Sequence, residues 1–234
     1  MLTKLRQKLK QRIRSRNRQV GKWEQTKAPG HAKAARGHVR AIRKLRRIIR
    51  RKTDASNATL SDKGAAFISS FEGFFSKPYN DPVGYATVGY GHLLGYRPVN
   101  DADRQGVWIK GQDKPGQLTE REARQLLRQK VAADYAPAVK SLFDKGGPLE
   151  GQFTQEFFDG LVSFAFNLGP GSVTPGTPGF ETVGRAIESG NRQAIASALL
   201  LYDKAGGSAL PGLTRRRRAE NRLIRTGNYS TEFP

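Results

Sequence analysis

The 234-residue sequence predicts an α+β fold: a mainly helical domain with a small antiparallel sheet near its start, preceded by a cationic helical extension. Apolar residues recur at spacings of three and four along much of the chain, which is typical of helices that pack through one face. Residues 74–94 are instead rich in Tyr, Val, Thr, Gly and Pro, which favours short strands and turns.

Positive charge divides the chain into two parts. Residues 1–52 hold 20 of the 41 Lys and Arg residues and a single acid, Glu24. Residues 53–234 carry 21 bases and 19 acids, which leaves +2 of the net charge of +21. We therefore expect a cationic extension over 1–52, a linker of small polar residues over 53–58, and a globular domain over 59–234.

Two amphipathic helices are expected in the extension. Lys27-Ala28-Pro29-Gly30 should separate them, because Pro and Gly interrupt helices. Both apolar stripes are thin, so a hairpin of the two helices would bury little surface. The stripes consist of Leu2, Leu5, Leu9 and Ile13, and of Ala35, Val39, Ile42, Leu45 and Ile49.

The composition of the extension leaves its partner open. A solvated cationic tail is one interpretation. Attachment to an anionic envelope polymer or membrane surface is the second, since apolar residues opposite Arg suit an interfacial helix. Non-specific binding of nucleic acid is the third, although Trp23 is the only aromatic residue available for stacking on bases. We favour the envelope over nucleic acid.

Several classes of protein are excluded or disfavoured by composition. The chain has no cysteine, which excludes disulfides and thiolate metal sites, and its three histidines lack zinc-site spacing. No apolar run approaches the roughly 20 residues that span a bilayer, and the charged start does not read as a signal peptide. We expect a monomer with no metal or cofactor.

The globular domain opens with a helix that ends near Glu72. Ser61 can cap this helix, and Asp62 lies favourably at the positive end of its dipole. Glu72 at the helix end, among Phe71, Phe74 and Phe75, has the surroundings that raise a carboxyl pKa. Such a group suits a general acid.

The following segment predicts a small sheet that carries a second acid. A turn is expected at Asp81-Pro82-Val83-Gly84, where the Asp81 carboxylate should be wetter than that of Glu72. Thr87 follows on the next strand, with a hydroxyl able to hold a water. Two carboxylates in different surroundings are what cleavage of a glycosidic bond requires.

The rest of the domain predicts helices with recognisable ends. Thr119 and Glu122 form a capping box, and Gly227 should close the last helix. A polar insertion is expected from about residue 97 to 117. The remaining helices are expected over 153–167, 182–189, 192–201 and 214–226, with a loop at Gly206-Gly207.

These motifs together resemble the phage-type lysozymes, the endolysins of glycoside hydrolase family 24. That family's pattern is Glu, then an acid or Cys nine positions on, then Thr six further, and Glu72, Asp81 and Thr87 have this spacing. The resemblance covers most of residues 60–228. Its other parts are Thr87–Leu94, Ser163–Gly169, Asp203–Gly207 with Leu210–Leu213, and Arg215–Glu220.

The resemblance implies roles for individual residues. It implies that Glu72 is the general acid, that Asp81 stabilises the transition state or acts as base, and that Thr87 places the attacking water. It also implies that the sugar cleft is lined by Leu93, Phe166, Asn167 and, less securely, Thr182. We expect a structural role for His92, such as a hydrogen bond or ion pair that fixes its strand. The basic run Arg215–Arg218 reads as the solvated face of a helix.

A lysozyme-like peptidoglycan hydrolase, an endolysin, is the function that follows. It would cleave the β-1,4 bond between N-acetylmuramic acid and N-acetylglucosamine, acting on the wall after release from the host cytoplasm. A lytic transglycosylase acting on the same bond remains an alternative. So does a non-enzymatic envelope- or nucleic-acid-binding protein on a lysozyme fold, although the intact Glu–Asp–Thr set argues against it.

Overall fold

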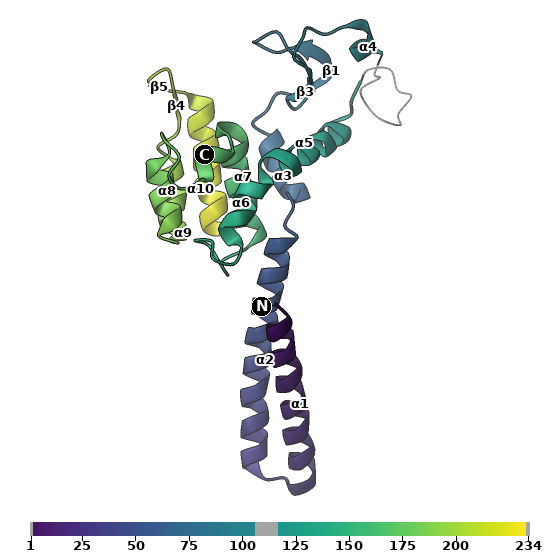
Figure 1. Cartoon of the computed structure of the whole chain (residues 1–234), viewed down its shortest axis with the longest axis vertical. Helices are drawn as coiled ribbons and strands as arrows, with labels where there is room; N and C mark the ends of the chain where they lie inside the picture. Colours follow the sequence, from purple (N-terminus) through teal and green to yellow (C-terminus); the bar gives the residue numbers. More distant parts are fainter. Residues whose placement is uncertain (1, 106–116, 233–234) are drawn as a thin grey trace.

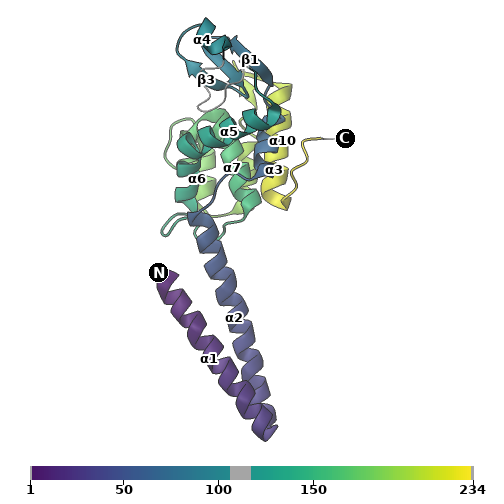
Figure 2. The same cartoon turned by 90° about the vertical axis from the view of Figure 1, so that its right-hand side faces the viewer.

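The computed structural model describes residues 2–105 and 117–232. A globular part forms one end of the molecule, and a hairpin of two long helices projects from it (Figure 1). The hairpin consists of α1 (Leu2–Thr26) and α2 (Pro29–Ser56). In Figure 2 the start of α1 lies beside the part of α2 that approaches the globular part, so the two helices run antiparallel.

The break between the two hairpin helices falls where the sequence predicts it. Lys27 adopts φ of 52°, a left-handed conformation that ends α1 after its amide donates to the Trp23 carbonyl. Pro29 is the first residue of α2, where its missing N–H costs nothing. At the other end α2 continues to Ser56. The linker expected over 53–58 is therefore mostly helix, because no residue before Asn57 interrupts the helix.

The globular part is mainly helical with a small sheet, as the sequence predicts. Its first half runs through α3 (Asp62–Ser69), β1 (Phe75–Asn80), β2 (Ala86–Gly89), β3 (His92–Gly95), α4 (Asp101–Arg104), α5 (Glu120–Asp134) and α6 (Ala136–Phe143). Its second half runs through α7 (Gln155–Leu168), the 3₁₀ turn η1 (Pro170–Val173), α8 (Glu181–Glu188), α9 (Arg192–Leu199), β4 (Lys204–Ala205), β5 (Ser208–Ala209) and α10 (Pro211–Thr226).

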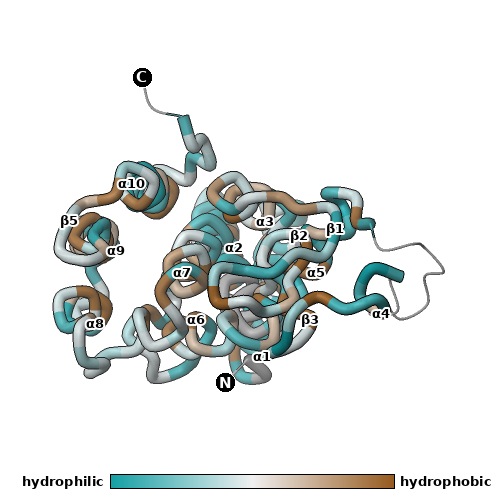
Figure 3. Tube along the Cα trace, turned by 90° about the horizontal axis from the view of Figure 1, so that it is seen from above, coloured by the Kyte–Doolittle hydropathy of each residue, from teal (hydrophilic) through white to brown (hydrophobic). Residues whose placement is uncertain are grey.

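Two lobes with separate cores make up the globular part. Seen from above, β1–β3 and α4 lie on one side, α8–α10 lie on the other, and α3, α6 and α7 lie between (Figure 3). The larger core surrounds α7, whose Phe157, Phe158, Leu161 and Phe164 are fully buried. A smaller cluster beneath the sheet consists of Val88, Tyr90, Leu118 and Ala123. Helix α5 contributes to both cores and so joins the lobes.

The three strands form an antiparallel sheet in the order β1-β2-β3. Thr87 of β2 lies opposite Tyr79 of β1 and Leu93 of β3. The register shifts between Phe75 and Tyr79 and again after Ala86. Such irregularities bend a strand and re-aim its side chains, and here they flank the residues that carry the proposed chemistry.

Three predicted helix-end signals are confirmed, although α3 ends at Ser69, before Glu72, and α10 begins at Pro211, before the predicted residue 214. Ser61 caps α3 through the Gly64 amide, and Thr119 and Glu122 form the capping box of α5. Gly227 closes α10 with φ of 77°. These signals depend on residues close together in sequence, which is why they could be read without the structure.

Four features were not predicted. They are α4, which has its own capping box between Asn100 and Asp103, α6, the 3₁₀ turn η1, and the two-stranded hairpin β4–β5 around Gly206 and Gly207. Residues 106–116 of the expected polar insertion lie outside the described residues. Within the described ranges, we find no helix long and apolar enough to cross a membrane.

Candidate active site

Glu72 lies where the two lobes meet. Helix α3 ends at Ser69, so Glu72 follows the helix by three residues, slightly farther than the sequence predicts. Its side chain is 29% exposed, and Oε1 accepts a hydrogen bond from Arg216 Nη1 at 2.6 Å. Because Arg216 belongs to α10, this ion pair ties the start of the sheet lobe to the helical lobe.

Asp81 occupies the predicted turn after β1. Its Oδ1 accepts from the amides of Val83 and Tyr85, both at 2.9 Å, and its carbonyl accepts from Gly84 at 2.8 Å. The turn is therefore built around the side chain as well as the backbone, as expected for an Asx-type turn. These bonds hold the partly exposed carboxylate in a fixed orientation.

Thr87 is the most buried of the three proposed catalytic residues. It is 4% exposed, and its hydroxyl donates to the Tyr85 carbonyl at 3.2 Å. Tyr85 also binds Asp81 through its amide, so one residue connects the turn acid and the strand threonine.

Tyr79 brings the two acids into one electrostatic environment. Burial raises the pKa of its phenol, and the negative charges of Asp81 and then of Glu72 raise it further. Both carboxylates therefore lie within electrostatic range of one phenol, on the residue that pairs with Thr87 in the sheet, and these four residues are called the Glu72 cluster from here on. The sequence analysis did not single out Tyr79, although it lies two positions before Asp81 and so on the same side of an extended chain.

Arg216, which binds Glu72, belongs to a group of buried charged residues on α10. Arg216 is 3% exposed and also donates to Glu220 Oε1 and to the Ser163 carbonyl, both at 3.2 Å. Ser163 donates its hydroxyl to the same Glu220 oxygen at 2.7 Å. The Arg216 guanidinium also lies 5.3 Å from the centre of the Phe71 ring, within cation–π range.

Arg217 extends this network toward Asn167. Its Nη2 donates to Asn167 Oδ1 at 2.8 Å, and its Nε lies 3.0 Å from Glu220 Oε2. Burial lowers the pKa of Arg217, while the Glu220 carboxylate offsets part of that effect. Glu72 and Asn167 are therefore linked through Arg216, Glu220 and Arg217.

The expectation that Arg215–Arg218 forms a solvated face is wrong for its two central residues. Arg215 and Arg218 are exposed, but Arg216 and Arg217 are buried. Helical spacing could have revealed this. Arg216, Arg217 and Glu220 share the stripe of three and four with the residues of α10 that enter the core, Leu223 and Ile224.

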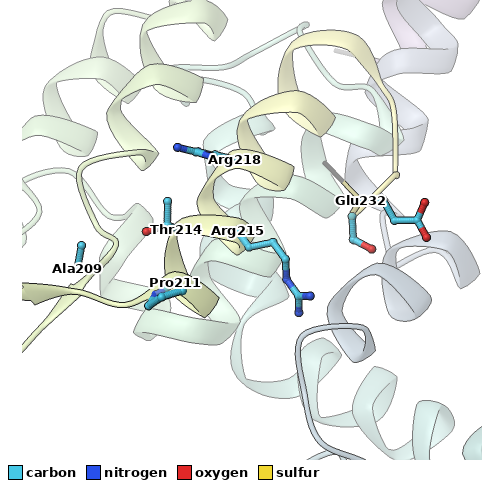
Figure 4. Close-up of a pocket in the computed structure, with 7 residues that line it drawn as sticks. Ala209, Pro211, Thr214, Arg215, Arg218 and Glu232 are labelled. Carbon is cyan, nitrogen blue, oxygen red and sulfur yellow. The ribbon is translucent and has the colours of Figure 1, made fainter. Parts of the chain in front are cut away.

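The two exposed arginines border a separate hollow of about 710 Å³ on the surface of α10 (Figure 4). Their side chains point in different directions there. Thr214, Pro211, Ala209, Thr231 and Glu232 complete the lining, and none of the predicted site residues contributes to it.

The four candidate substrate residues differ in their surroundings. Leu93 is half-buried opposite Thr87. Phe166 contacts Tyr135 at 5.3 Å between ring centroids and lies 6.0 Å from the Arg216 guanidinium. Asn167 is held by Arg217. Thr182 is contacted by Arg185 of its own helix, at 3.4 Å, and nothing ties it to the Glu72 cluster among the contacts described.

We expected His92 to fix its strand through a hydrogen bond or ion pair, but its Nδ1 atom makes no such contact. That nitrogen is buried without a hydrogen-bond partner. Burial lowers the pKa of the imidazole, and the positive charge of Lys130 lowers it further, so a neutral ring is favoured over an ion pair. Among the described residues, no group of three or more His, Asp or Glu side chains could hold a metal ion.

A helical lobe and a sheet lobe that meet at a Glu held by a buried arginine, with an Asp–Thr pair on the neighbouring sheet, define a lysozyme-like protein. The Phage lysozyme family model matches residues 69–220, and the chain belongs to that family. The match spans the sheet, the candidate site and all but the end of α10.

Curated relatives agree with this assignment. An endolysin of Bacillus phage B103 is 33% identical over 170 residues, which are 72% of this chain and 54% of the relative. An endolysin of Acyrthosiphon pisum secondary endosymbiont phage 1 is 26% identical over 169 residues, 70% of this chain and 97% of the relative. The chain spans about half the length of the Bacillus phage relatives it matches.

Solved structures show the same fold. An endolysin from Escherichia coli O157:H7 phage FAHEc1 aligns with a TM-score of 0.53 and 25% identity, covering 74% of this chain and 98% of that one. The muramidase domain of SpmX from Asticaccaulis excentricus aligns with a TM-score of 0.51 and 27% identity, over 71% of this chain and 97% of that one.

Proposed function

We propose that this protein is a peptidoglycan hydrolase that cleaves the β-1,4 bond between N-acetylmuramic acid and N-acetylglucosamine. The observation that carries the proposal is the clustering of Glu72, Asp81 and Thr87 around Tyr79 at the junction of the two lobes. Membership of the Phage lysozyme family supports the substrate class. The names of the relatives, endolysin and muramidase, support it as well.

Glu72 is the proposed general acid. Protonation of the leaving oxygen requires a carboxyl that is held in place yet open to substrate. Arg216 holds one Glu72 oxygen, and the side chain is partly exposed, so the carboxyl stays accessible from solvent. Ser163, Glu220 and Asn167 fix the arginines behind it, so the carboxyl is positioned by a rigid helix rather than by its own loop.

Asp81 and Thr87 are the proposed partners of Glu72. Asp81 would stabilise the oxocarbenium-like transition state or activate water, and Thr87 would help to orient that water. Leu93, Phe166 and Asn167 are proposed to line the sugar cleft. Thr182 remains the weakest of these proposals, because its described contact stays within α8.

A turbidity assay on purified peptidoglycan tests the role of Glu72. We expect Glu72→Gln to lose about 10²- to 10⁴-fold in clearing rate, the usual contribution of a positioned acid. Glu188→Gln is the matched control, since it alters an exposed glutamate at the end of α8. Clearing by Glu72→Gln at the wild-type rate, with circular dichroism showing both variants folded, would exclude this mechanism.

Product analysis tests the reaction type. The anomer formed at first cleavage, read by NMR, distinguishes inversion from retention, and a 1,6-anhydro product would reveal the transglycosylase alternative. In the same reactions, Asp81→Asn should lower kcat more than KM, because its proposed role is exercised mainly in the transition state.

The place of action follows from the same proposal. The wall is the expected site, reached after release from the host cytoplasm. The cationic hairpin is proposed to concentrate the enzyme on an anionic surface there, and we expect the protein to act as a monomer.

A further inference from the structure

The α1–α2 hairpin is called the arm from here on, and Lys and Arg are the predominant residues on its exposed surface. All seventeen Lys and Arg residues between positions 4 and 48 are exposed. Residues 1–52 contain one acid, Glu24, so the arm cannot balance this charge from its own residues. Cations at this density repel one another unless an external anion neutralises them.

The apolar residues of the arm are used within the hairpin. Leu5, Leu9 and Ile13 of α1 are half-buried, and Ala35 and Ile42 of α2 are 9% and 7% exposed. A stripe that already covers its partner helix is not free to enter a bilayer, because exposing it would require opening the hairpin.

Polar contacts across the arm hold the two helices in this arrangement. His31 Nδ1 lies 2.8 Å from Gln19 Oε1, and Arg12 Nη1 lies 3.3 Å from His38 Nδ1. The exposed aromatic of the arm is Trp23 near the turn, and it is covered on one face by Lys27, 4.7 Å from the ring centroid. The surface that a partner could contact is therefore elongated and positively charged, and it is not apolar.

We propose that the arm binds an anionic polymer of the cell wall, one that carries a phosphate or carboxylate in each repeat. The proposal rests on the proposed function, because a wall substrate for the globular part is what favours a wall polymer over other polyanions. A helix of 25 residues is about 37 Å long. The cations of α1 and α2 could therefore pair with the anions of several successive repeats of one extended polymer chain.

Nucleic acid fits the arm less well than a wall polymer does. Phosphates of a duplex would also be attracted, but the arm has no aromatic platform for bases beyond Trp23 and no feature that reads a sequence. A polymer covalently attached to peptidoglycan would instead bring the arm and the active site to the same material. Binding through the arm would then raise the effective concentration of the globular part at its substrate.

The test uses the full chain with five exposed positions changed. In the neutralised variant, Arg6, Lys10, Arg14, Arg43 and Arg47 are all replaced by Gln, which keeps helix propensity while removing charge. In the matched control, the four arginines become Lys and Lys10 becomes Arg, so the charge stays. Circular dichroism checks that both variants keep the hairpin.

Binding is measured by cosedimentation with walls whose phosphate-rich polymers are intact or have been removed by acid extraction. The neutralised variant should bind intact walls about tenfold more weakly than wild type at low salt, and the difference should fade at high salt. On walls from which the phosphate-rich polymers have been removed, the neutralised variant and wild type should bind equally well and clear at equal rates. The matched control should behave as wild type on both.

Several results would overturn the proposal. Equal binding of intact and stripped walls by wild type would do so, as would unchanged binding of the neutralised variant. The proposal would also be wrong if wild type bound phosphatidylglycerol vesicles more tightly than intact walls, which would indicate a membrane partner. The same holds for tighter binding to random-sequence duplex DNA than to intact walls, which would indicate nucleic acid. If wild type and both variants all failed to clear walls while wild type still bound them, the proposed hydrolysis would be wrong and the proposed polymer binding would not be affected.

Discussion

Arg216 shows how one buried side chain can serve both stability and the proposed chemistry. It is 3% exposed and pairs with Glu72, Glu220 and the Ser163 carbonyl. A buried guanidinium is tolerated only when its donors are satisfied, so these contacts are mutually required. Glu72 therefore depends on a network that lies mostly in the other lobe.

Replacing Arg216 tests this dependence. Arg216→Met should lower kcat about 10- to 100-fold by releasing the Glu72 carboxyl, and should destabilise the fold by about 3–5 kcal/mol because Glu220 loses a buried partner. Arg216→Lys should recover part of both losses, since an ammonium keeps the charge but not the three-way geometry. The measurements are kcat and KM on soluble wall fragments and urea unfolding. An unchanged kcat in the folded Met variant would remove Arg216 from the positioning of Glu72.

Asp159 provides a second prediction, of pH-dependent stability. It is fully buried on α7 and accepts from the Ser61 hydroxyl at 2.5 Å, the Tyr229 hydroxyl at 2.7 Å and Gln155 Nε2 at 2.8 Å. Burial raises the pKa of this carboxyl above its ordinary value, and the hydrogen bonds offset part of the rise. The folded state therefore binds the proton more tightly than the unfolded chain does, so stability is lost as pH rises from about 4 through the folded pKa.

Asp159→Asn removes this titration. The unfolding free energy of wild type, measured in urea, should fall relative to that of the variant as the pH rises above about 4. Asp103→Asn is the control of opposite sign, because the hydrogen bond from Arg97 lowers the pKa of Asp103. Its contribution should instead be lost as pH falls below about 4. Parallel pH profiles for wild type and Asp159→Asn would contradict the assignment.

Residues that act across the fold were the hardest to predict from sequence. Glu72, Asp81 and Thr87 could be proposed because their spacing forms a local pattern. The pairing of Arg216 with Glu72 could not, because 144 positions separate the two residues, even though helical spacing indicates that Arg216 faces the core. The contact between Asp159 and Ser61 joins residues 98 positions apart, so no local pattern in the sequence indicates it.

At the scale of elements, close packing of α7 against α10 sets a limit on side-chain size. A Cβ added at Gly160 would lie 2.6 Å from Ile224 Cγ1, too near for the two helices to keep their separation. Gly37 on α2 is the matched helical glycine, since a Cβ there meets nothing within 4 Å.

The two glycines should therefore respond to alanine in opposite directions. Gly160→Ala should destabilise the globular part by about 1–3 kcal/mol through overpacking. Gly37→Ala should stabilise the arm by roughly 0.5–1 kcal/mol, because alanine has the higher helix propensity. Urea unfolding followed by circular dichroism measures both. A neutral or stabilising Gly160→Ala would mean that α7 and α10 can separate without cost.

Elements with local end signals were predicted well, and those without them were not. Ser61, the Thr119–Glu122 pair and Gly227 each marked a helix boundary correctly. By contrast, α6 begins at Ala136 without a side-chain cap and follows α5 directly, so its start is marked only by Pro137 in its first turn, where proline is favoured. The small polar residues after residue 52 suggested a linker, yet α2 continues to Ser56, since such residues only weaken a helix.

At the scale of the whole molecule, the C-terminal segment closes the globular part while the arm stands apart from it. Tyr229 donates to Asp159 of α7, which also accepts from the α3 cap Ser61, and its ring packs edge-on against Phe67 of α3 at 6.2 Å between centroids. Among the arm's described side chains, residues 4–48, no such hydrogen bond to the globular part is found, and only Ala35 and Ile42 are buried. The two parts should therefore open as separate cooperative units.

Hydrogen exchange measured by mass spectrometry on the full chain tests this separation. Arm amides should exchange with a lower opening free energy than those of α7, because the arm buries far less apolar surface. Tyr229→Phe should speed exchange in α3 and α7 by the loss of one hydrogen bond, about 0.5–1.5 kcal/mol, and leave the arm unchanged. Gly37→Ala should do the reverse, slowing exchange in the arm alone. If either substitution changed protection in both parts equally, the continuous α2 helix would be shown to couple the arm to the catalytic lobes, and the arm would have to be treated as part of a single folding unit.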